Sequence, residues 1–279
     1  MKYTRIALVF AALFVGSTMS PLAEAQNDAH PLLTDKFSID LGVFFPQRTV
    51  TLSVDGPINS AAGDIDFDET IGLKESDDVF SVNFGWRFGE KWMLGTQYFK
   101  SSGETGKFLE EDVEWNDTTF GQGTGIAAGQ EFQLIRTFFA RKFKSSDKQE
   151  FGLGLGIHWL EIGAWIEGNA VINGAPAGFR RESVKAEAPL PNIGAFYLYS
   201  ISPKWAFRAR LDWLSAKVGD YDGTLTNVAA GINYQMFEYA GIGLSYNLFD
   251  LDLNVNKDGW HGNVNTRYDG AFVHVSFYW

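Results

Sequence analysis

The chain of 279 residues contains no cysteine. Disulfide bonds and metal sites with thiolate ligands are therefore excluded. A lipid-anchored lipoprotein is excluded as well, because no thiol is present to carry the acyl chain. If the protein is exported to an oxidising compartment, its stability must come from the fold without covalent cross-links.

Long apolar runs are also absent after residue 26. The best candidate, Phe151 to Leu160, is interrupted by three glycines and by His158. A transmembrane helix needs about 20 consecutive apolar residues. The sequence therefore excludes a helical membrane protein and leaves a water-soluble domain or a membrane β-barrel, whose strands carry apolar residues at alternate positions.

Positive charge is scarce, because 23 Lys and Arg residues stand against 34 Asp and Glu residues, a net charge of −11. Nucleic-acid binding, which needs a basic face, is therefore not expected. The sequence contains no glycine-rich phosphate loop, zinc motif or nucleophile elbow. We predict no cofactor and no nucleic-acid partner.

The N-terminal residues are typical of a secretory signal peptide. Lys2 and Arg5 precede the apolar stretch Ile6 to Val15, and Ala23-Glu24-Ala25 forms an A-x-A cleavage site. The apolar stretch is too short for a stable membrane-spanning helix. We predict a signal peptide at 1–25 and a single mature domain at 26–279.

Alternation with a period of two dominates the mature chain and predicts β-strands. In the last segment, one face carries Ala271, Val273, Val275, Phe277 and Trp279, and the other carries Gly270, Phe272, His274, Ser276 and Tyr278. The polar faces are rich in glycine with scattered Arg and Asp, which suits the crowded interior of a narrow barrel better than the outside of a water-soluble sandwich. Aromatic residues make up 15% of the chain, as expected for a surface that faces lipid.

The connections between the strands alternate between short turns and mostly longer polar segments, as in outer-membrane barrels. The longer segments are at 55–78, 103–130, 167–186 and 254–267. We predict an all-β fold, an antiparallel up-and-down transmembrane β-barrel of about ten strands located in the outer membrane; eight or twelve strands stay possible. The predicted strands are 36–54, 79–88, 91–102, 130–144, 150–166, 186–201, 204–218, 224–236, 239–253 and 267–279.

Two stretches fit this pattern less well. Arg136 and Arg141, in the fourth predicted strand, have opposite parity. After Leu248 the apolar residues change phase and fall on Leu251, Leu253 and Val255. A β-bulge, or the exit of the strand from the membrane, would explain this second change.

Four segments resemble small Gram-negative outer-membrane barrels, in particular the outer-membrane protein W-like and uncharacterised barrel-domain groups. They are Ala188-Pro189-Leu190-Pro191, Gly219-Asp220-Tyr221-Asp222-Gly223, Gly241 to Tyr246 and Tyr268-Asp269-Gly270. The C-terminal strand likewise resembles the C-terminal signature of such barrels. The resemblance implies that Val273, Val275, Phe277 and Trp279 form the signal that the barrel-assembly machinery reads, and it transfers no enzymatic residue.

Five charged residues are predicted to point into the lumen: Asp40, Arg87, Arg208, Arg210 and Asp212. They could form a constriction that selects solutes by charge. Alternatively, they form a network of paired charges that fills a barrel too narrow to conduct. The second interpretation predicts that no large steady pore exists.

Other possible sites are less well supported. His274 and Ser276 share a face, as in barrel-shaped lipid A deacylases, but they point inward and have no acidic neighbour in sequence.

Omptin-like proteases have ten strands and an Asp-x-His motif, which Asp258 and His261 only approximate. The Asp250-x-Asp252 pattern is common in external loops and is weak evidence for a protease. Asp64, Asp66 and Asp68 could bind a hard cation that bridges to lipopolysaccharide phosphates, although a solvated acidic loop is the commoner explanation of such a cluster.

The sequence thus favours a non-catalytic outer-membrane barrel, either structural or a narrow passage for small or apolar solutes. Its expected partners are outer-membrane lipid, lipopolysaccharide and the barrel-assembly machinery. An enzyme acting on lipid or peptide at the outer surface and an adhesin that binds through its long loops stay open as alternatives.

Overall fold

The structure is a computed structural model that describes residues 29–55, 65–67, 69–73, 78–115, 117–146, 148–257 and 260–279. The predicted signal peptide lies outside these ranges. Within them the chain forms one 13-stranded sheet and one short helix, α1 (Pro31–Thr34). In this part of the chain, no helix is long and apolar enough to cross a membrane.

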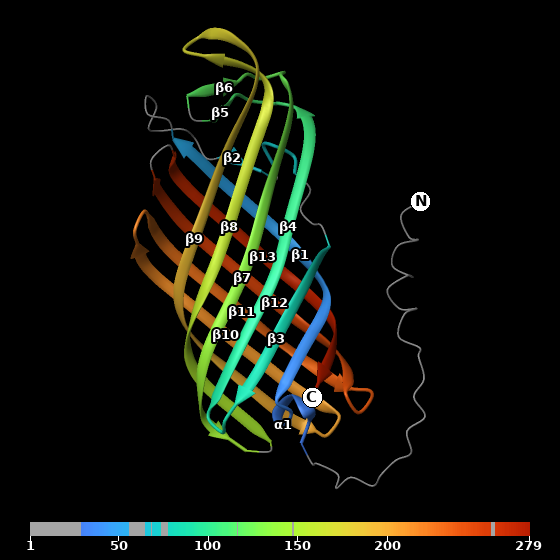
Figure 1. Cartoon of the computed structure of the whole chain (residues 1–279). Helices are drawn as coiled ribbons and strands as arrows, with labels where there is room; N and C mark the ends of the chain where they lie inside the picture. The colour runs from blue at the N-terminus through green and yellow to red at the C-terminus, as the bar shows by residue number, and fades with distance from the viewer. Residues whose placement is uncertain are drawn as a thin grey trace, which may run out of the picture.

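Ten of the described strands close into an antiparallel barrel (Figure 1). The ring closes where β1 pairs with β13, from Ser38 opposite Tyr278 to Asp55 opposite His261. The predicted all-β, up-and-down barrel is therefore confirmed. Its strands are β1 (Phe37–Asp55), β3 (Val79–Phe88), β4 (Trp92–Phe108), β7 (Gly125–Ser145), β8 (Gln149–Ile172), β9 (Ala175–Ser202), β10 (Trp205–Val218), β11 (Tyr221–Gln235), β12 (Ala240–Lys257) and β13 (Trp260–Tyr278), and the short strands β2 (Ile65–Asp66), β5 (Val113–Trp115) and β6 (Thr118–Phe120) complete the sheet.

The short turns lie together at one end of the barrel, which we call the periplasmic end because tight turns face the periplasm in outer-membrane barrels. They join β3 to β4, β7 to β8, β9 to β10, and β11 to β12. Helix α1 and the C-terminus lie at the same end (Figure 1). Exposed aromatic side chains accompany these turns, as an interfacial girdle requires: Trp92, Phe143, Phe151, Trp205, Phe237, Tyr239 and Trp279.

At the opposite, outer end several strands are longer than predicted, whereas β1, β3 and β10 agree with their predicted bounds to within one residue. Strands β8 and β9 contain 24 and 28 residues, although about 9–11 residues suffice for a tilted strand to cross the bilayer. The predicted loops at 103–130, 167–186 and 254–267 are therefore wrong in large part, because most of these residues continue the neighbouring strands. A two-residue Asn173-Gly174 turn, with both φ angles positive, joins β8 to β9. Asn-Gly is the preferred sequence for such a hairpin turn.

The outer surface of the periplasmic half is an apolar belt. Side chains such as Leu41, Val43, Leu155, Leu244 and Val273 point outward and are exposed. A patch of this size on a water-soluble protein would be a strong aggregation hazard. In a barrel it is the surface that contacts the lipid chains.

The interior changes from polar to apolar along the strands. Strand β12 shows this clearly, because Gly243 and Asn247 face inward in the periplasmic half whereas Leu251 and Val255 face inward farther out. The register of β12 with β11 and β13 is continuous. Of the two explanations considered for the change of phase after Leu248, the bulge is therefore excluded and the exit from the membrane fits. Outside the bilayer, water replaces lipid and apolar side chains turn inward.

The N-terminal segment of the described chain fills the periplasmic mouth. Leu32 and Leu33 of α1 are buried in an apolar cluster with Phe138, Phe196 and Tyr278. The backbone N–H of His30 donates to Ser200 Oγ at 2.9 Å, and the His30 ring packs edge-on against Tyr278. The helix thus acts as a plug that the alternating strand pattern does not predict.

Candidate functional site

A layer of buried ion pairs crosses the lumen in the periplasmic half. Arg208 reaches from β10 across to β1, where it donates to Asp40 at 2.6 Å. Ser276, on β13, donates to the other oxygen of the same carboxylate at 2.7 Å. Asp40 and Ser276 are direct partners in the β1–β13 register, so the sheet itself brings them together.

The second pair of this layer contains a residue that the sequence interpretation left out. Arg136, on β7, binds Asp212 through two hydrogen bonds, one of which measures 2.8 Å between Nη2 and Oδ1. Asp212 is fully buried. The apparent conflict with Arg141 is resolved because Arg141 faces outward, where its guanidinium lies over the rings of Trp92 and Phe143.

Arg87 does not belong to this layer, contrary to the grouping of the five charges in the sequence. It lies at the periplasmic mouth, where it donates to Glu150 at 2.9 Å and to the carbonyl oxygen of Leu33 in α1. Lys142 also contacts Glu150, at 3.3 Å. Arg87 thus links the plug to Glu150, and it lines the periplasmic part of the cavity that Arg208 and Arg210 also line. Glu150 and Lys142 adjoin predicted turns, so their spacing carried no signal of a lumenal role.

The two inward-facing histidines are built into amide networks. His158 lies between the amides of Asn192 and Asn227, at 3.0 and 3.1 Å. In His274, Nε2 lies 3.0 Å from an Arg208 nitrogen, and because a guanidinium can only donate, the imidazole must accept there and is neutral.

His274 and Ser276 gain an acidic neighbour in the fold that they lack in sequence. The neighbour is Asp40, which accepts from Ser276 but lies 3.9 Å from His274 Nε2. A nucleophile and its base must themselves share a hydrogen bond. The structure gives Ser276 its bond to Asp40 instead, so the three residues are arranged as lumenal packing.

Positive charge exceeds negative charge around this part of the lumen. Among the described residues, the cations Arg87, Arg136, Lys142, Arg208 and Arg210 face the carboxylates Asp40, Glu150 and Asp212. This set therefore has two more cations than carboxylates, and Asp35, which attracts Arg87 at the mouth, reduces the difference to one, although the whole chain is acidic. Arg210 has no carboxylate in hydrogen-bond contact in the described structure and donates instead to Oε1 of Gln97.

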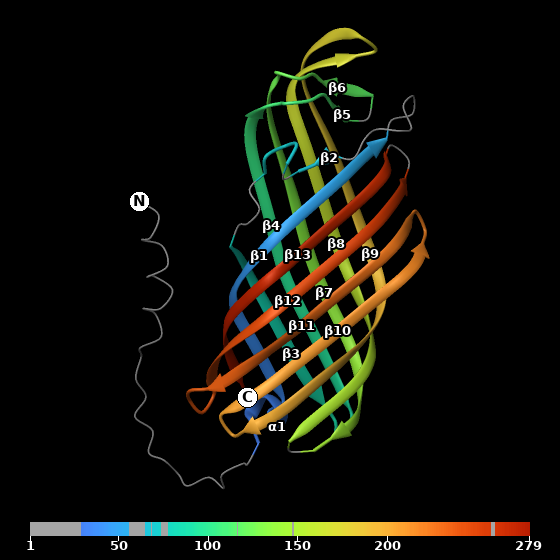
Figure 2. The same cartoon turned by 180° about the vertical axis from the view of Figure 1, so that it is seen from behind.

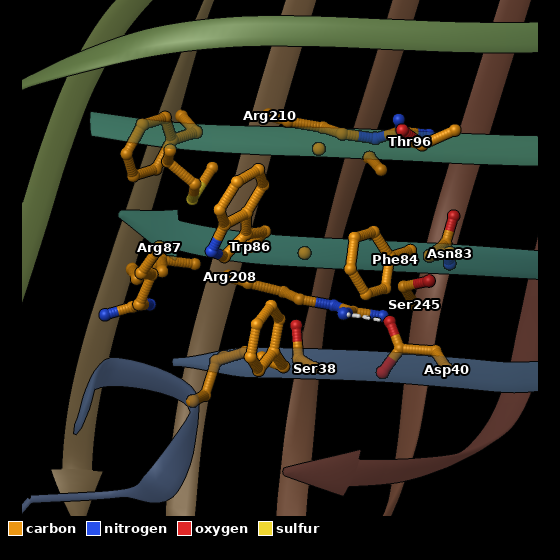
Figure 3. Close-up of a pocket in the computed structure, with 18 of the residues that line it drawn as sticks. Ser38, Asp40, Asn83, Phe84, Trp86, Arg87, Thr96, Arg208, Arg210 and Ser245 are labelled. Carbon is orange, nitrogen blue, oxygen red and sulfur yellow. Dashed lines mark hydrogen bonds and ion pairs between the residues drawn. The ribbon is translucent and has the colours of Figure 1, made fainter. Parts of the chain in front are cut away.

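These side chains surround a cavity of about 150 Å³ (Figure 3). Arg208 and Arg210 extend across it, and Ser245 and Asn247 line it from β12. Pro31, Leu32 and Asp35, in and beside α1, line its periplasmic side. Gly85 and Gly95, which are partners in the β3–β4 register, also line it, and the Ser38 side chain occupies the space that a Cβ of Gly85 would take.

Above the cavity the lumen is closed by apolar side chains. Phe99, Phe132 and Tyr268 stack against one another with ring centroids 4.9 to 6.1 Å apart, and Phe132 also packs against Phe249 at 5.4 Å. All four are buried. We call this group the aromatic seal, and it separates the cavity from the outer end.

A second cavity of about 460 Å³ lies in the outer half. It is beside Val79, the outer end of β3, beyond which the neighbouring strands β1 and β4 continue. Its lining includes Arg48, Glu104, Gln130 and Trp165. It shares no lining residue with the lumenal cavity. Gln130 contacts the aromatic seal directly, through a 3.4 Å bond to Tyr268.

The cation site considered at Asp64, Asp66 and Asp68 stays a prediction, because only Asp66 lies within the described residues. Asp64 and Asp68 lie outside the described residues, and Asp66 accepts from the backbone N–H of Glu69. No group of three or more potential metal ligands occurs among the described residues.

The residues considered for protease activity are likewise not gathered into a site. Asp258 lies outside the described residues, and His261 is exposed. In the Asp-x-Asp pattern, Asp250 faces Arg267 at 3.9 Å and Asp252 accepts from Asn263 at 2.9 Å.

The proposed C-terminal signal residues have a common orientation. Val273, Val275, Phe277 and Trp279 point outward from β13 and are partly or fully exposed. Their role in assembly stays a prediction.

One of the solved structures compared with the chain supports this architecture. No protein-family model and no curated protein sequence matches the chain. Among solved structures, the outer membrane protease OmpT from Escherichia coli aligns with a TM-score of 0.61 at 10% identity, over 88% of this chain and 97% of that chain. The Pseudomonas putida toluene transporter TodX aligns with a TM-score of 0.42 at 10% identity, over 89% and 91% of the two chains.

A third structure, the attachment invasion locus protein Ail of Yersinia pestis, aligns with a TM-score of 0.34 at 11% identity, over 87% and 99% of the two chains. The likeness to OmpT concerns the fold alone. Together with the apolar belt and the periplasmic girdle, it identifies the chain as an outer-membrane β-barrel located in the Gram-negative outer membrane.

Proposed function

We propose that this protein is a sealed, non-catalytic outer-membrane barrel that acts through the structure it presents outside the membrane. The observation that carries the proposal is the aromatic seal, formed by Phe99, Phe132, Phe249 and Tyr268. Close-packed apolar side chains leave no path for water or ions. This favours a structural or surface role over the narrow passage that the sequence also allowed.

Planar-bilayer recordings test the seal. The purified protein should give no steady conductance, and neither should a variant that lacks residues 29–36, because the aromatic seal remains after the plug is removed. If the truncated variant conducts steadily, the plug is the only barrier and the protein is a gated passage. Steady conductance of the intact protein would refute the proposal directly.

The extended hairpin of β8 and β9 is the feature best suited to a surface role (Figures 1 and 2). Its outward face carries Lys185 between Glu161 and Glu187, at 2.9 and 3.1 Å. Nearby, the Arg181 guanidinium lies 4.0 Å from the centre of the Trp165 ring and 2.9 Å from Glu167. These contacts stiffen the hairpin, and a stiff surface loses little entropy when it binds a partner.

The hairpin can be shortened without changing its register. Asn169 is paired with Phe179, so replacing residues 170–178 by Asn-Gly preserves a two-residue turn. We expect this variant to assemble normally and to lose surface attachment in a cell-adhesion assay. Unchanged attachment, with normal assembly, would leave only the structural role.

Incubation with basic peptides tests the non-catalytic assignment. We expect no cleavage, and turnover would overturn the assignment. Lipopolysaccharide, outer-membrane lipid and the assembly machinery are the partners we propose. The narrower relationship to the outer-membrane protein W-like group stays a prediction based on the sequence motifs.

A further inference from the structure

The lumenal cavity is lined by charges that do not balance. Arg208 and Arg136 each hold a carboxylate, whereas the hydrogen-bond partner that the structure records for Arg210 is the neutral amide of Gln97. Asp212 and Asp40 attract Arg210 without a hydrogen bond to it, whereas Arg136 and Arg208 repel it. A buried cation without a counter-charge in direct contact costs several kcal/mol. The neighbouring acids are already engaged by other groups, because Asp40 binds Arg208 and Ser276, and Asp212 binds Arg136 through both oxygens.

The space beside Arg210 is large enough for a ligand. A single water needs roughly 10–15 Å³ of such space, and the cavity offers about 150 Å³. Ser245, Asn247, Asn83 and Thr96 line it with hydroxyl and amide groups, and Figure 3 shows Arg210 directed across the cavity towards Thr96. Arginine guanidinium groups bind carboxylate and phosphate oxygens in two-pronged geometry.

We propose that this cavity binds a small oxyanion, of the size of acetate or inorganic phosphate, with Arg210 as its principal ligand. The anion supplies the negative charge that the protein leaves out, and the hydroxyl and amide groups of the lining complete its hydrogen bonds. The aromatic seal blocks the outer side, so the anion must pass the α1 plug to enter from the periplasmic mouth. This binding site is independent of the surface role proposed above.

The test is calorimetric titration of the full-length protein, purified in detergent in a chloride-free buffer, with inorganic phosphate, acetate or chloride. We expect saturable binding of phosphate or acetate by the intact protein and at least tenfold weaker binding by Arg210→Gln. The matched control is Arg181→Gln, which removes an arginine from the outer hairpin and should bind like the intact protein. Phosphate and acetate are separate arms, so their relative affinities identify the preferred oxyanion.

The Arg210→Gln variant is expected to fold. The substitution removes a buried cation that makes no hydrogen bond to a carboxylate, so it leaves no carboxylate without its partner. Its thermal unfolding midpoint should equal or exceed that of the intact protein without ligand, and phosphate should raise only the midpoint of the intact protein. Binding that Arg210→Gln leaves unchanged would overturn the proposal. So would the absence of heat with both oxyanions, or equal affinity for chloride.

Discussion

Replacing Asp212 by asparagine tests whether the lumenal charges exist as obligatory pairs. The substitution keeps the shape of the side chain but removes the only carboxylate that Arg136 contacts in the described structure. It also increases the cation surplus of the interior by one. Breaking a fully buried pair by removing one partner costs about 3–5 kcal/mol. Because the amide oxygen still accepts one hydrogen bond, we expect the lower end, about 3 kcal/mol.

The assay is urea unfolding in phospholipid bilayers, followed by the fluorescence of the nine tryptophans. The control is Asp250→Asn, whose partner Arg267 lies 3.9 Å away and whose side chain is 44% exposed. An exposed pair of this kind contributes at most about 1 kcal/mol. The control should therefore unfold at nearly the same urea concentration as the intact protein.

The double variant Arg136→Gln/Asp212→Asn makes the test decisive. It removes both charges, so it should be more stable than Asp212→Asn alone, with a coupling energy of about 2 kcal/mol in the double-mutant cycle. If the two single effects simply add, the residues do not depend on each other. The interpretation of the layer as paired, lumen-filling charge would then be refuted.

Three further predictions concern the plug, the seal and the strand packing. Burial lowers the pKa of His30 to about 4 in the docked plug, whereas an undocked His30 titrates near 6.5. Below pH 6.5 the undocked state therefore binds a proton that the docked state does not, and the free energy of plug docking should weaken by roughly 2 kcal/mol at pH 5. Hydrogen exchange at Leu33, corrected for the intrinsic rate, measures this effect, and His30→Asn, which keeps a helix-capping side chain, should lose the pH dependence. Phe132→Ala should lower the free energy of unfolding by about 3–5 kcal/mol, measured by urea unfolding, and an effect below 1 kcal/mol would contradict tight packing of the seal. Gly270→Ala would place its Cβ 2.0 Å from the Phe45 carbonyl oxygen, so a loss of about 1–3 kcal/mol is expected, and an unchanged urea midpoint would show that the two strands can separate.

The sequence predicted which way most side chains point, because successive side chains along a β-strand alternate between the two faces of the sheet whatever surrounds it. Asp40 and Asp212 were assigned to the interior and Val275 and Phe277 to the outside, and the structure places them there. The lumenal pairings were not readable. They depend on how far each strand is shifted along its neighbours around the ring, so Arg208 meets a partner 168 positions away.

Two errors of the sequence interpretation have local causes. The loop assigned to 167–186 contains Asn173-Gly174, a hairpin signal that was present but was outweighed by the polarity of the segment. Arg136 and Arg141 fitted the strand pattern poorly because their parities are opposite, yet the structure turns Arg136 into the lumen and Arg141 outward to the interface, so Arg136 was left out of the lumenal set. The plug helix, Pro31–Thr34, has the sequence Pro-Leu-Leu-Thr. Four residues are too few to show a periodic pattern, so the sequence did not predict this helix.

The change of interior from polar to apolar also explains how one continuous strand can be stable in two solvents. In the bilayer no hydrophobic force favours an apolar interior, so polar pairs and small residues can fill it while apolar side chains contact lipid. Outside the bilayer the same inward positions hold Leu251 and Leu253, which bury apolar surface away from water. The bond between Tyr246 and Asp269 lies on the outward face close to this transition, where apolar residues give way to charge. Since the sheet continues without interruption across it, the outer half is a rigid extension of the membrane barrel, and the β8–β9 hairpin inherits that rigidity.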